Sequence, residues 1–233
     1  MECGCCEPMR GGSASRREST AQPLPGEEIP VELDPEAVRP LYTGRDPVHD
    51  FEHVLRVMHL AERIARMEGA DRAVVRAAAL LHDVRREEND HAAASAAFAR
   101  RWLAERGAPP EFIEAVAHAI EAHRFREPRA ARTLEARVLF DADKLDALGI
   151  IGLARLFAYS GVHRHPLWMP VGEGEIDADS AAHEFYRKIR FLPGRMQTET
   201  GRRWAEVRLA RMQKAIEWLE AEIRGEDFED GGT

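Results

Sequence analysis

Cysteine is nearly absent from this chain. The 233 residues include only three, Cys3, Cys5 and Cys6, so no thiol elsewhere can pair with them. Disulfides therefore do not staple the folded part, which is typical of a reducing compartment, and we expect a cytoplasmic location. Three clustered thiols lack a fourth ligand for zinc, so we interpret this segment as part of a disordered tail.

Long hydrophobic runs are also missing. No window approaches the roughly 18 consecutive apolar residues that a membrane span needs. The opening residues, "MECGCCEPMR", do not show a basic segment followed by an apolar one, so they do not resemble a secretory signal. We therefore expect no association with a membrane.

Aromatic residues are scarce, whereas alanine and charged residues are abundant. The chain is 7% aromatic, 44% hydrophobic and 32% charged, a composition that favours helices over sheets. The net charge of -8 disfavours a nucleic-acid polymer as partner, and it requires a local positive site or a metal to bind an anionic substrate. We predict an all-α fold built as a single helical bundle, because a chain of this length is typical of one domain.

Composition also divides the chain into three parts. Residues 1–33 are rich in Gly, Pro, Ser and charge without a hydrophobic period, which predicts a disordered N-terminal tail. Residues 34–225 carry the helical domain, and residues 226–233 form an acidic C-terminal tail. Within the domain, residues 160–176 contain three glycines and two prolines, which indicates an ordered loop or lid.

Capping residues and the hydrophobic period predict the helices of the domain. Asp71 and Asp90 are expected to cap two of them, and Pro109 and Pro110 to open another. The expected helices span about residues 49–68, 72–85, 91–106, 110–123, 133–161, 178–191 and 198–224. The last of these carries a stripe that forms either core or the seam of a homodimer: Leu209, Met212, Ile216, Leu219 and Ile223.

Polar residues interrupt the apolar faces of three expected helices. His53 leads the apolar face of the first helix, and His82 ends that of the second. Asp143 and Asp146 lie on the stripe of the fifth helix that continues through Leu139 and Ile150. A buried ionised carboxylate is costly unless it is paired or bound to a metal. A cation shared between these helices accounts for all of the interruptions.

The ligand set that this argument selects is His53, His82, Asp83 and Asp143. Two imidazoles and two carboxylates suit Mn, Fe, Co, Zn or, less readily, Mg, and among these we favour Mn. Each residue also has a simpler interpretation. A single His on an apolar face is more often a core residue than a ligand, and Asp143 alone could pair with an arginine.

Several segments of the sequence resemble the motifs of a known family. The segments "HDFEHVLRV", "AALLHDV" and "FDADKLDALG" are similar to the successive motifs of the HD-domain metal-dependent phosphohydrolases, an all-helical superfamily. Further segments, "LARLFAYSG", "HEFYRKIRFL" and "MQTETGRRWAEVR", resemble its small stand-alone bacterial members. The resemblance covers about residues 45–215. It implies metal ligation by His53, His82, Asp83 and Asp143, with His49 as the competing choice for the first ligand.

The resemblance also implies a mechanism. A metal in such a site lowers the pKa of its bound water and polarises a phosphoryl oxygen, so that metal-bound hydroxide attacks phosphorus. Asp83 could both bind the metal and accept a proton from the water. Asp146 is a candidate partner for a ligand imidazole, or else the acid of a buried salt bridge.

Several other polar residues are candidates for substrate binding or for a second metal. The five that we select are His118, His123, Lys144, Lys188 and Arg56. His123 continues an apolar helix face, whereas His118 lies well round the same helix. The two loop histidines, His163 and His165, could close over a substrate. Any of these side chains could instead belong to a solvated face or brace a carboxylate.

We therefore expect an enzyme that cleaves a small phosphorylated compound, and the resemblance favours a nucleoside triphosphate or a related phosphoanhydride. Phosphate loops of the GxxxxGK[ST] type and G-x-S-x-G elbows are missing from the sequence, which is consistent with metal-dependent chemistry. The alternative is a non-catalytic, metal-stabilised helical module that senses a nucleotide.

Overall fold

The described part of the chain is all helical. The computed structural model describes residues 33–46, 48–124, 130–169 and 180–228, and within these ranges there are α-helices and 3₁₀-helices but no strands. Three predicted parts lie outside the described residues: residues 1–32 of the expected N-terminal tail with its cysteines, residues 170–176 of the expected loop, and residues 229–233 of the acidic tail. The elements are α1 (Pro35–Val38), η1 (Arg39–Tyr42), α2 (Phe51–Glu68), α3 (Arg72–Leu81), α4 (His91–Ala104), α5 (Pro110–Ala122), α6 (Leu134–Leu145), α7 (Gly149–Val162), α8 (Ala181–Arg187), η2 (Ile189–Arg195) and α9 (Glu199–Arg224).

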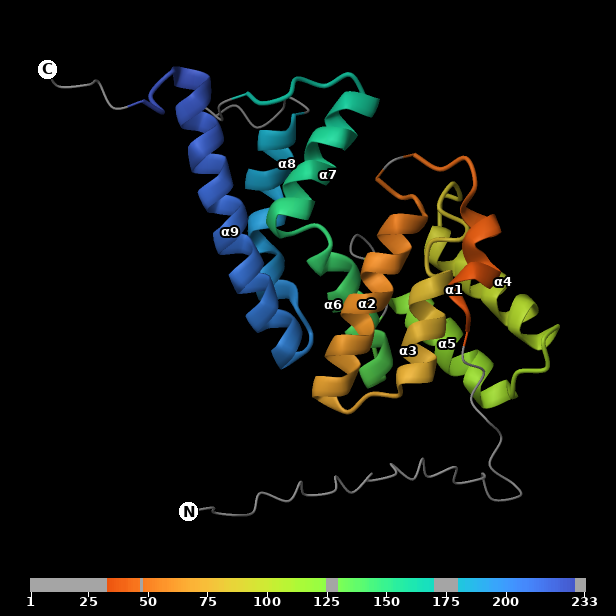
Figure 1. Cartoon of the computed structure of the whole chain (residues 1–233). Helices are drawn as coiled ribbons and strands as arrows, with labels where there is room; N and C mark the ends of the chain where they lie inside the picture. Colours follow the sequence, from red (N-terminus) through yellow and green to blue (C-terminus); the bar gives the residue numbers. More distant parts are fainter. Residues whose placement is uncertain (1–32, 47, 125–129, 170–179, 229–233) are drawn as a thin grey trace, which may run out of the picture.

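Two groups of helices meet along α2 and α6. On one side α2 and α6 pack with α3 and α5, and α4 packs on α5. On the other side stand α7, α8 and α9, as Figure 1 shows, and α9 contacts both α6 and α2. The apolar faces of these helices form one continuous core, which includes Val57, Ile64 and Leu139. The site described below lies where the two groups meet.

Side-chain caps begin most of the helices where the sequence predicts them. Asp71 accepts from the backbone of Ala73 at 2.8 Å, and Asp90 accepts from Ala93 at 3.2 Å. Each cap satisfies an amide that has no partner inside its helix. Helix α2 ends at Gly69, which has a φ of 80°, a conformation that glycine adopts without steric cost. These caps explain why the starts of α3 and α4 agree with the sequence, whereas α5 has no side-chain cap and begins at Pro110, as predicted.

The expected helix over residues 133–161 is wrong, because the chain makes a corner there. Helix α6 ends at Leu145, and α7 begins at Gly149, which has a φ of 77°. The two helices are bent by 67° at this break. Ile150 of the predicted stripe is consequently 59% exposed, whereas Leu153 beyond it is buried.

Two other helix ends also differ from expectation. Helix α3 stops at Leu81, and turns rather than helix follow it to residue 90. The helix expected over residues 178–191 is the shorter α8, after which the chain tightens into η2. The stripe of α9 is divided: Met212 and Ile216 are buried, whereas Ile223 is half exposed. No single described helix is long and apolar enough to span a membrane, although the bent pair α6 and α7 reaches the required length and composition together.

Candidate metal centre and pocket

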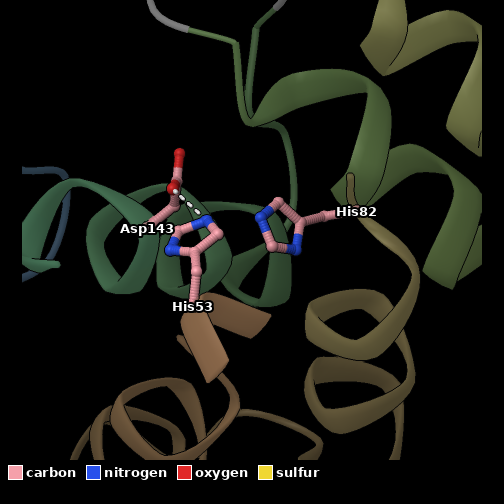
Figure 2. A group of neighbouring side chains, drawn as sticks. All are labelled: His53, His82 and Asp143. Carbon is pink, nitrogen blue, oxygen red and sulfur yellow. Dashed lines mark ion pairs between the residues drawn. The ribbon is translucent and has the colours of Figure 1, made fainter. Parts of the chain in front are cut away.

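Histidines and carboxylates from separate helices converge between α2, α3 and α6. His53 of α2, His82 at the end of α3 and Asp143 of α6 each offer a ligand atom within 4.8 Å of the other two. Figure 2 shows these side chains pointing toward one another. His53 Nε2 lies 3.6 Å from Asp143 Oδ1, and the rings of His53 and His82 are 5.4 Å apart. Helix packing therefore assembles a group that could hold a metal ion.

The orientation of each imidazole is set by the partner of its Nδ1 atom. His82 Nδ1 donates to the carbonyl of Ala79 at 2.7 Å, and His123 Nδ1 donates to that of Ile120 at 2.5 Å. His53 Nδ1 donates to Asp146 Oδ2 at 2.8 Å. In all three rings the Nε2 lone pair is left for another partner, which is how metal-binding histidines are commonly held.

Asp83 lies between two groups of imidazoles. Its Oδ2 is 4.0 Å from His53 Nε2 and 3.8 Å from His82 Nε2. Its Oδ1 is 3.8 Å from His91 Nε2 and 3.7 Å from His123 Nε2. Asp83, His91 and His123 form a second group whose ligand atoms lie within 4.8 Å of one another. One carboxylate thus faces two candidate cation positions.

Two buried polar atoms at the centre make no hydrogen bond, although Asp83 Oδ1 lies 3.6 Å from Arg86 Nη1. Within the described residues, His82 Nε2 and Asp83 Oδ1 are shielded from solvent and make no hydrogen bond. Leaving such atoms unsatisfied costs about 1–3 kcal/mol each. A cation in the first group would satisfy His82 Nε2, and one in the second group would satisfy Asp83 Oδ1, so the donor set fits a divalent metal at either position.

The protonation states at the centre also suit metal binding. Burial lowers the pKa of His82 to about 4 and that of His91 to about 4. Burial raises the pKa of the Asp83 and Asp143 carboxyls, but the nearby imidazoles and cations outweigh this effect and hold both pKa values below the usual range. At neutral pH the two imidazoles are neutral and the two carboxylates ionised, which are the forms that coordinate metals.

Asp146 lies behind His53 rather than among the candidate ligand atoms. Its Oδ2 accepts from His53 Nδ1 and from Arg155 Nη1, each at 2.8 Å. Its Oδ1 accepts from Arg56 Nε at 2.8 Å. Burial opposes ionisation, but these hydrogen bonds and charges hold the pKa of Asp146 well below its usual range. Asp146 is therefore both a partner of an imidazole and the acid of a buried salt bridge.

A cavity of about 590 Å³ opens beside this centre, a size typical of small-molecule sites. Asp83, Asp143 and Glu184 are the carboxylates among its described lining residues. The cationic side chains there outnumber them, although the whole chain is acidic: Arg86, Arg124, Lys144, Arg155, Arg187 and Lys188. This local excess of positive charge favours an anionic ligand.

Of the five weaker sequence candidates, three line the cavity and two do not. His123, Lys144 and Lys188 line the cavity, and Lys144 pairs with Asp143. Arg56 braces Asp146 outside the lining, and His118 Nε2 accepts from the backbone of Arg132 at 3.2 Å, away from the cavity.

His49, the competing first ligand, lines the cavity but belongs to neither group of candidate ligands. Its Nδ1 faces Asp46, and its Nε2 lies 3.1 Å from Arg86. The packing of α2 therefore favours His53 as the residue that joins His82 and Asp143.

Several residues at this site could not be recognised from the sequence pattern. His91 begins α4 directly after the capping residue Asp90, so the helical period gives no sign that it turns inward. Arg86 follows α3 in a run of turns, and Arg155 lies beyond the corner that the sequence did not predict. The one available signal was the high density of histidine in residues 82–123.

Known proteins are similar to this chain over most of its length. The HD-domain family matches residues 50–148, the segment that contains His53, His82, Asp83 and Asp143. Protein YpgQ of Bacillus subtilis is 33% identical over 197 residues, which cover 82% of this chain and 93% of YpgQ. The crystal structure of YpgQ in complex with ADP has a TM-score of 0.68 and covers 83% of this chain and 100% of its own. An HD-superfamily hydrolase from Bacillus thuringiensis is 30% identical, with a TM-score of 0.63, and covers 81% of this chain and 97% of its own.

Proposed function

Because the chain belongs to the HD-domain family of metal-dependent phosphohydrolases, we propose that it hydrolyses a phosphoanhydride bond of a nucleotide, most plausibly a nucleoside triphosphate. The observation that carries this proposal is the cavity that joins the candidate metal centre to an excess of cationic side chains. A substrate with several phosphate groups matches both features, since it needs a cation at the reacting phosphorus and positive charge along its length.

We assign metal ligation to His53, His82, Asp83 and Asp143. The buried atoms of His82 and Asp83 that make no hydrogen bond support this assignment, and the mixed nitrogen and oxygen set favours Mn, with Fe, Co, Zn and Mg as alternatives. A divalent ion bound there supplies Lewis acidity to a phosphoryl oxygen and lowers the pKa of a water molecule. The second group, Asp83, His91 and His123, offers a further cation position, or its two histidines contact phosphate directly.

The chain's own residues bind and orient the substrate. Lys144 and Lys188 reach the cavity from α6 and from the end of α8 and would bind phosphate oxygens. Asp83 also lines the cavity, and its Oδ1 atom makes no hydrogen bond among the described residues. We assign this atom the role of accepting a proton from the attacking water. Asp146 holds the ring of His53 in place.

The ADP complex of YpgQ supports the choice of a nucleotide. That relative binds ADP in its crystal structure. The whole of that chain matches 83% of this one in fold. We infer that the cavity of this chain receives an adenine nucleotide or a close analogue.

A screen of metals against substrates tests this function. Release of phosphate and pyrophosphate would be measured for nucleoside triphosphates and diphosphates with Mn, Fe, Co, Zn and Mg. We expect turnover with at least one metal and a loss of at least about 100-fold in Asp143→Ala. His118→Ala is the matched control and should keep wild-type activity, because this histidine lies on α5 outside the cavity.

The screen separates the enzyme from a non-catalytic sensor. Tight binding of a nucleotide without turnover under any metal would favour the sensor. Full activity in Asp143→Ala would overturn the assignment of the metal ligands.

A further inference from the structure

One face of α7 runs along the cavity away from the candidate metal centre. The residues of this helix that line the cavity follow the helical period: Gly152, Arg155, Leu156, Tyr159 and Ser160. Arg155 marks the inner end, because its Nη1 donates to Asp146, the carboxylate that holds His53. Tyr159 lies four residues further along the helix, which is about 6 Å along its axis. The face therefore leads from the metal end of the cavity to its rim.

Three rings gather at this rim. The rings of Tyr159 and His163 are stacked, with centroids 4.0 Å apart and planes inclined by 28°. The ring of His165 lies 6.3 Å from that of Tyr159 and 5.6 Å from that of His163. Tyr159 and His165 line the cavity, whereas His163 covers Tyr159 from behind that lining.

The backbone at the end of α7 is shaped to hold these rings together. Arg164 has a φ of 58° and is the only described residue other than glycine with a positive φ, a conformation that carries a steric cost. This turn brings the chain back, so that the amide of His165 donates to the carbonyl of Ser160 at 2.8 Å. His163 Nδ1 donates to the carbonyl of Tyr159 at 2.9 Å. The clustering of the rings is thus a built feature and not a chance meeting of loop side chains.

The rings have no evident task in the core. Tyr159 is 42% exposed, His163 is exposed and His165 is half-buried. Exposed aromatic faces at the mouth of a cavity are suited to stacking on a planar ring, and such stacking tolerates every base because each has a π-face. Arg155 lies beside the candidate metal centre, and Tyr159 lies about 6 Å further along α7, so a nucleotide with its phosphates at that centre can direct its base toward Tyr159.

We propose that Tyr159 and His165, backed by His163, form a stacking subsite for the nucleobase of the substrate. This inference rests on the proposed function and adds to it: the enzyme selects nucleotides over inorganic polyphosphates through this subsite. Because stacking does not recognise base edges, the subsite gives little discrimination between purines and pyrimidines of equal phosphate number.

Kinetics on matched substrates tests the subsite. KM and kcat would be measured for ATP and for inorganic tripolyphosphate with the most active metal. In Tyr159→Ala we expect KM for ATP to rise at least about tenfold with little change in kcat, and KM for tripolyphosphate to stay the same. Tyr159→Phe should retain the wild-type KM because it keeps the ring. Val162→Ala, an exposed residue of α7 outside the lining, should leave both substrates unaffected.

A binding measurement makes the result independent of turnover. Calorimetric titration would compare ADP with inorganic pyrophosphate on the wild type, Tyr159→Ala and His165→Ala. We expect the two variants to lose affinity for ADP and to keep that for pyrophosphate. An unchanged KM for ATP, or an equal loss for ATP and tripolyphosphate, would overturn the subsite. If the wild type hydrolyses neither compound, the proposed function fails, and the ADP titration still decides the subsite.

Discussion

The rings of His53, His82 and His123 are each held at Nδ1 by a protein oxygen, and this single contact decides which nitrogen is free. For His82 and His123 the oxygen is a backbone carbonyl of the same helix, so the helix itself fixes the ring. For His53 it is the carboxylate of Asp146, which in turn is fixed by Arg56 and Arg155. His53 therefore depends on side chains of two other helices, and it is the ring that a distant substitution can most easily disturb.

Asp146→Asn tests this dependence. Asparagine removes the charge that faces the two arginines and weakens the contact to His53, so we expect the affinity for Mn to fall about 10- to 100-fold. Calorimetric titration with Mn would measure the change. Asp227→Asn, at an exposed position near the C-terminus, is the matched control. A lower kcat with unchanged Mn affinity would instead make Asp146 a direct participant in the reaction.

Part of the site could be predicted residue by residue. His53, His82 and Asp143 interrupt apolar faces, and the structure brings all three together with Asp83, although their role as ligands stays a prediction. His91 could not be predicted in this way, because it lies at the first position of a helix whose apolar face begins after it.

At the scale of elements, α9 is docked by its first turn. The buried Asp141 of α6 accepts from the amides of Gln197 and Thr198, each at 2.8 Å, and from the Thr198 hydroxyl at 2.7 Å. The helix approaches so closely that a Cβ atom on Gly201 would lie 2.7 Å from Cγ of Asp141. Only glycine fits there, which gives a physical reason for the glycine in the segment "TETGR".

Gly201→Ala should therefore destabilise the protein, although alanine is the better helix former. Overpacking of this kind costs about 1–3 kcal/mol, and denaturant unfolding would measure it. Gly161→Ala in α7 is the matched control, since nothing lies within 4 Å of its added Cβ. We expect that control to be neutral or slightly stabilising. A stable Gly201→Ala variant would contradict the close docking of α9 on α6.

The starts of helices could be predicted because their caps are local, whereas the corner between α6 and α7 could not. Asp146, Ala147 and Leu148 are all compatible with a helix, and a single glycine inside a helical pattern is weak evidence for a break. The break is held by contacts that are distant in sequence, such as the bond from Arg208 Nη1 to the carbonyl of Leu145 at 2.5 Å. Such contacts have no signature in the local pattern.

At the scale of the whole molecule, the candidate metal centre links folding to pH. The pKa of His82 is about 4 in the folded chain because the ring is buried, and it returns to about 6.5 on unfolding. Between these values the unfolded state binds more protons than the folded state. Stability therefore falls as the pH is lowered from about 6.5 toward 4.

Urea unfolding of the metal-free protein at several pH values would measure this effect. We expect His82 to contribute a loss of up to about 3 kcal/mol across this range. The loss should be smaller by this amount in His82→Gln, where His91 still titrates, and unchanged in His59→Gln, whose side chain is exposed. An equal pH dependence in wild type and His82→Gln would contradict the assignment to His82.

The corner between α6 and α7 separates the candidate metal ligand from the proposed base subsite, so the two helices can change independently. Asp143 lies on one arm of this corner and Tyr159 on the other, and the arms meet at 67°. One residue inserted within the first turn of α7 would rotate the rest of that helix by about 100° and carry Tyr159 away from the cavity, while α6 and its carboxylate stayed in place. Under the proposals above, the metal ligand lies on α6 and the base subsite on α7. A change of a single residue in α7 can therefore alter which compounds are cleaved without altering the chemistry at Asp143.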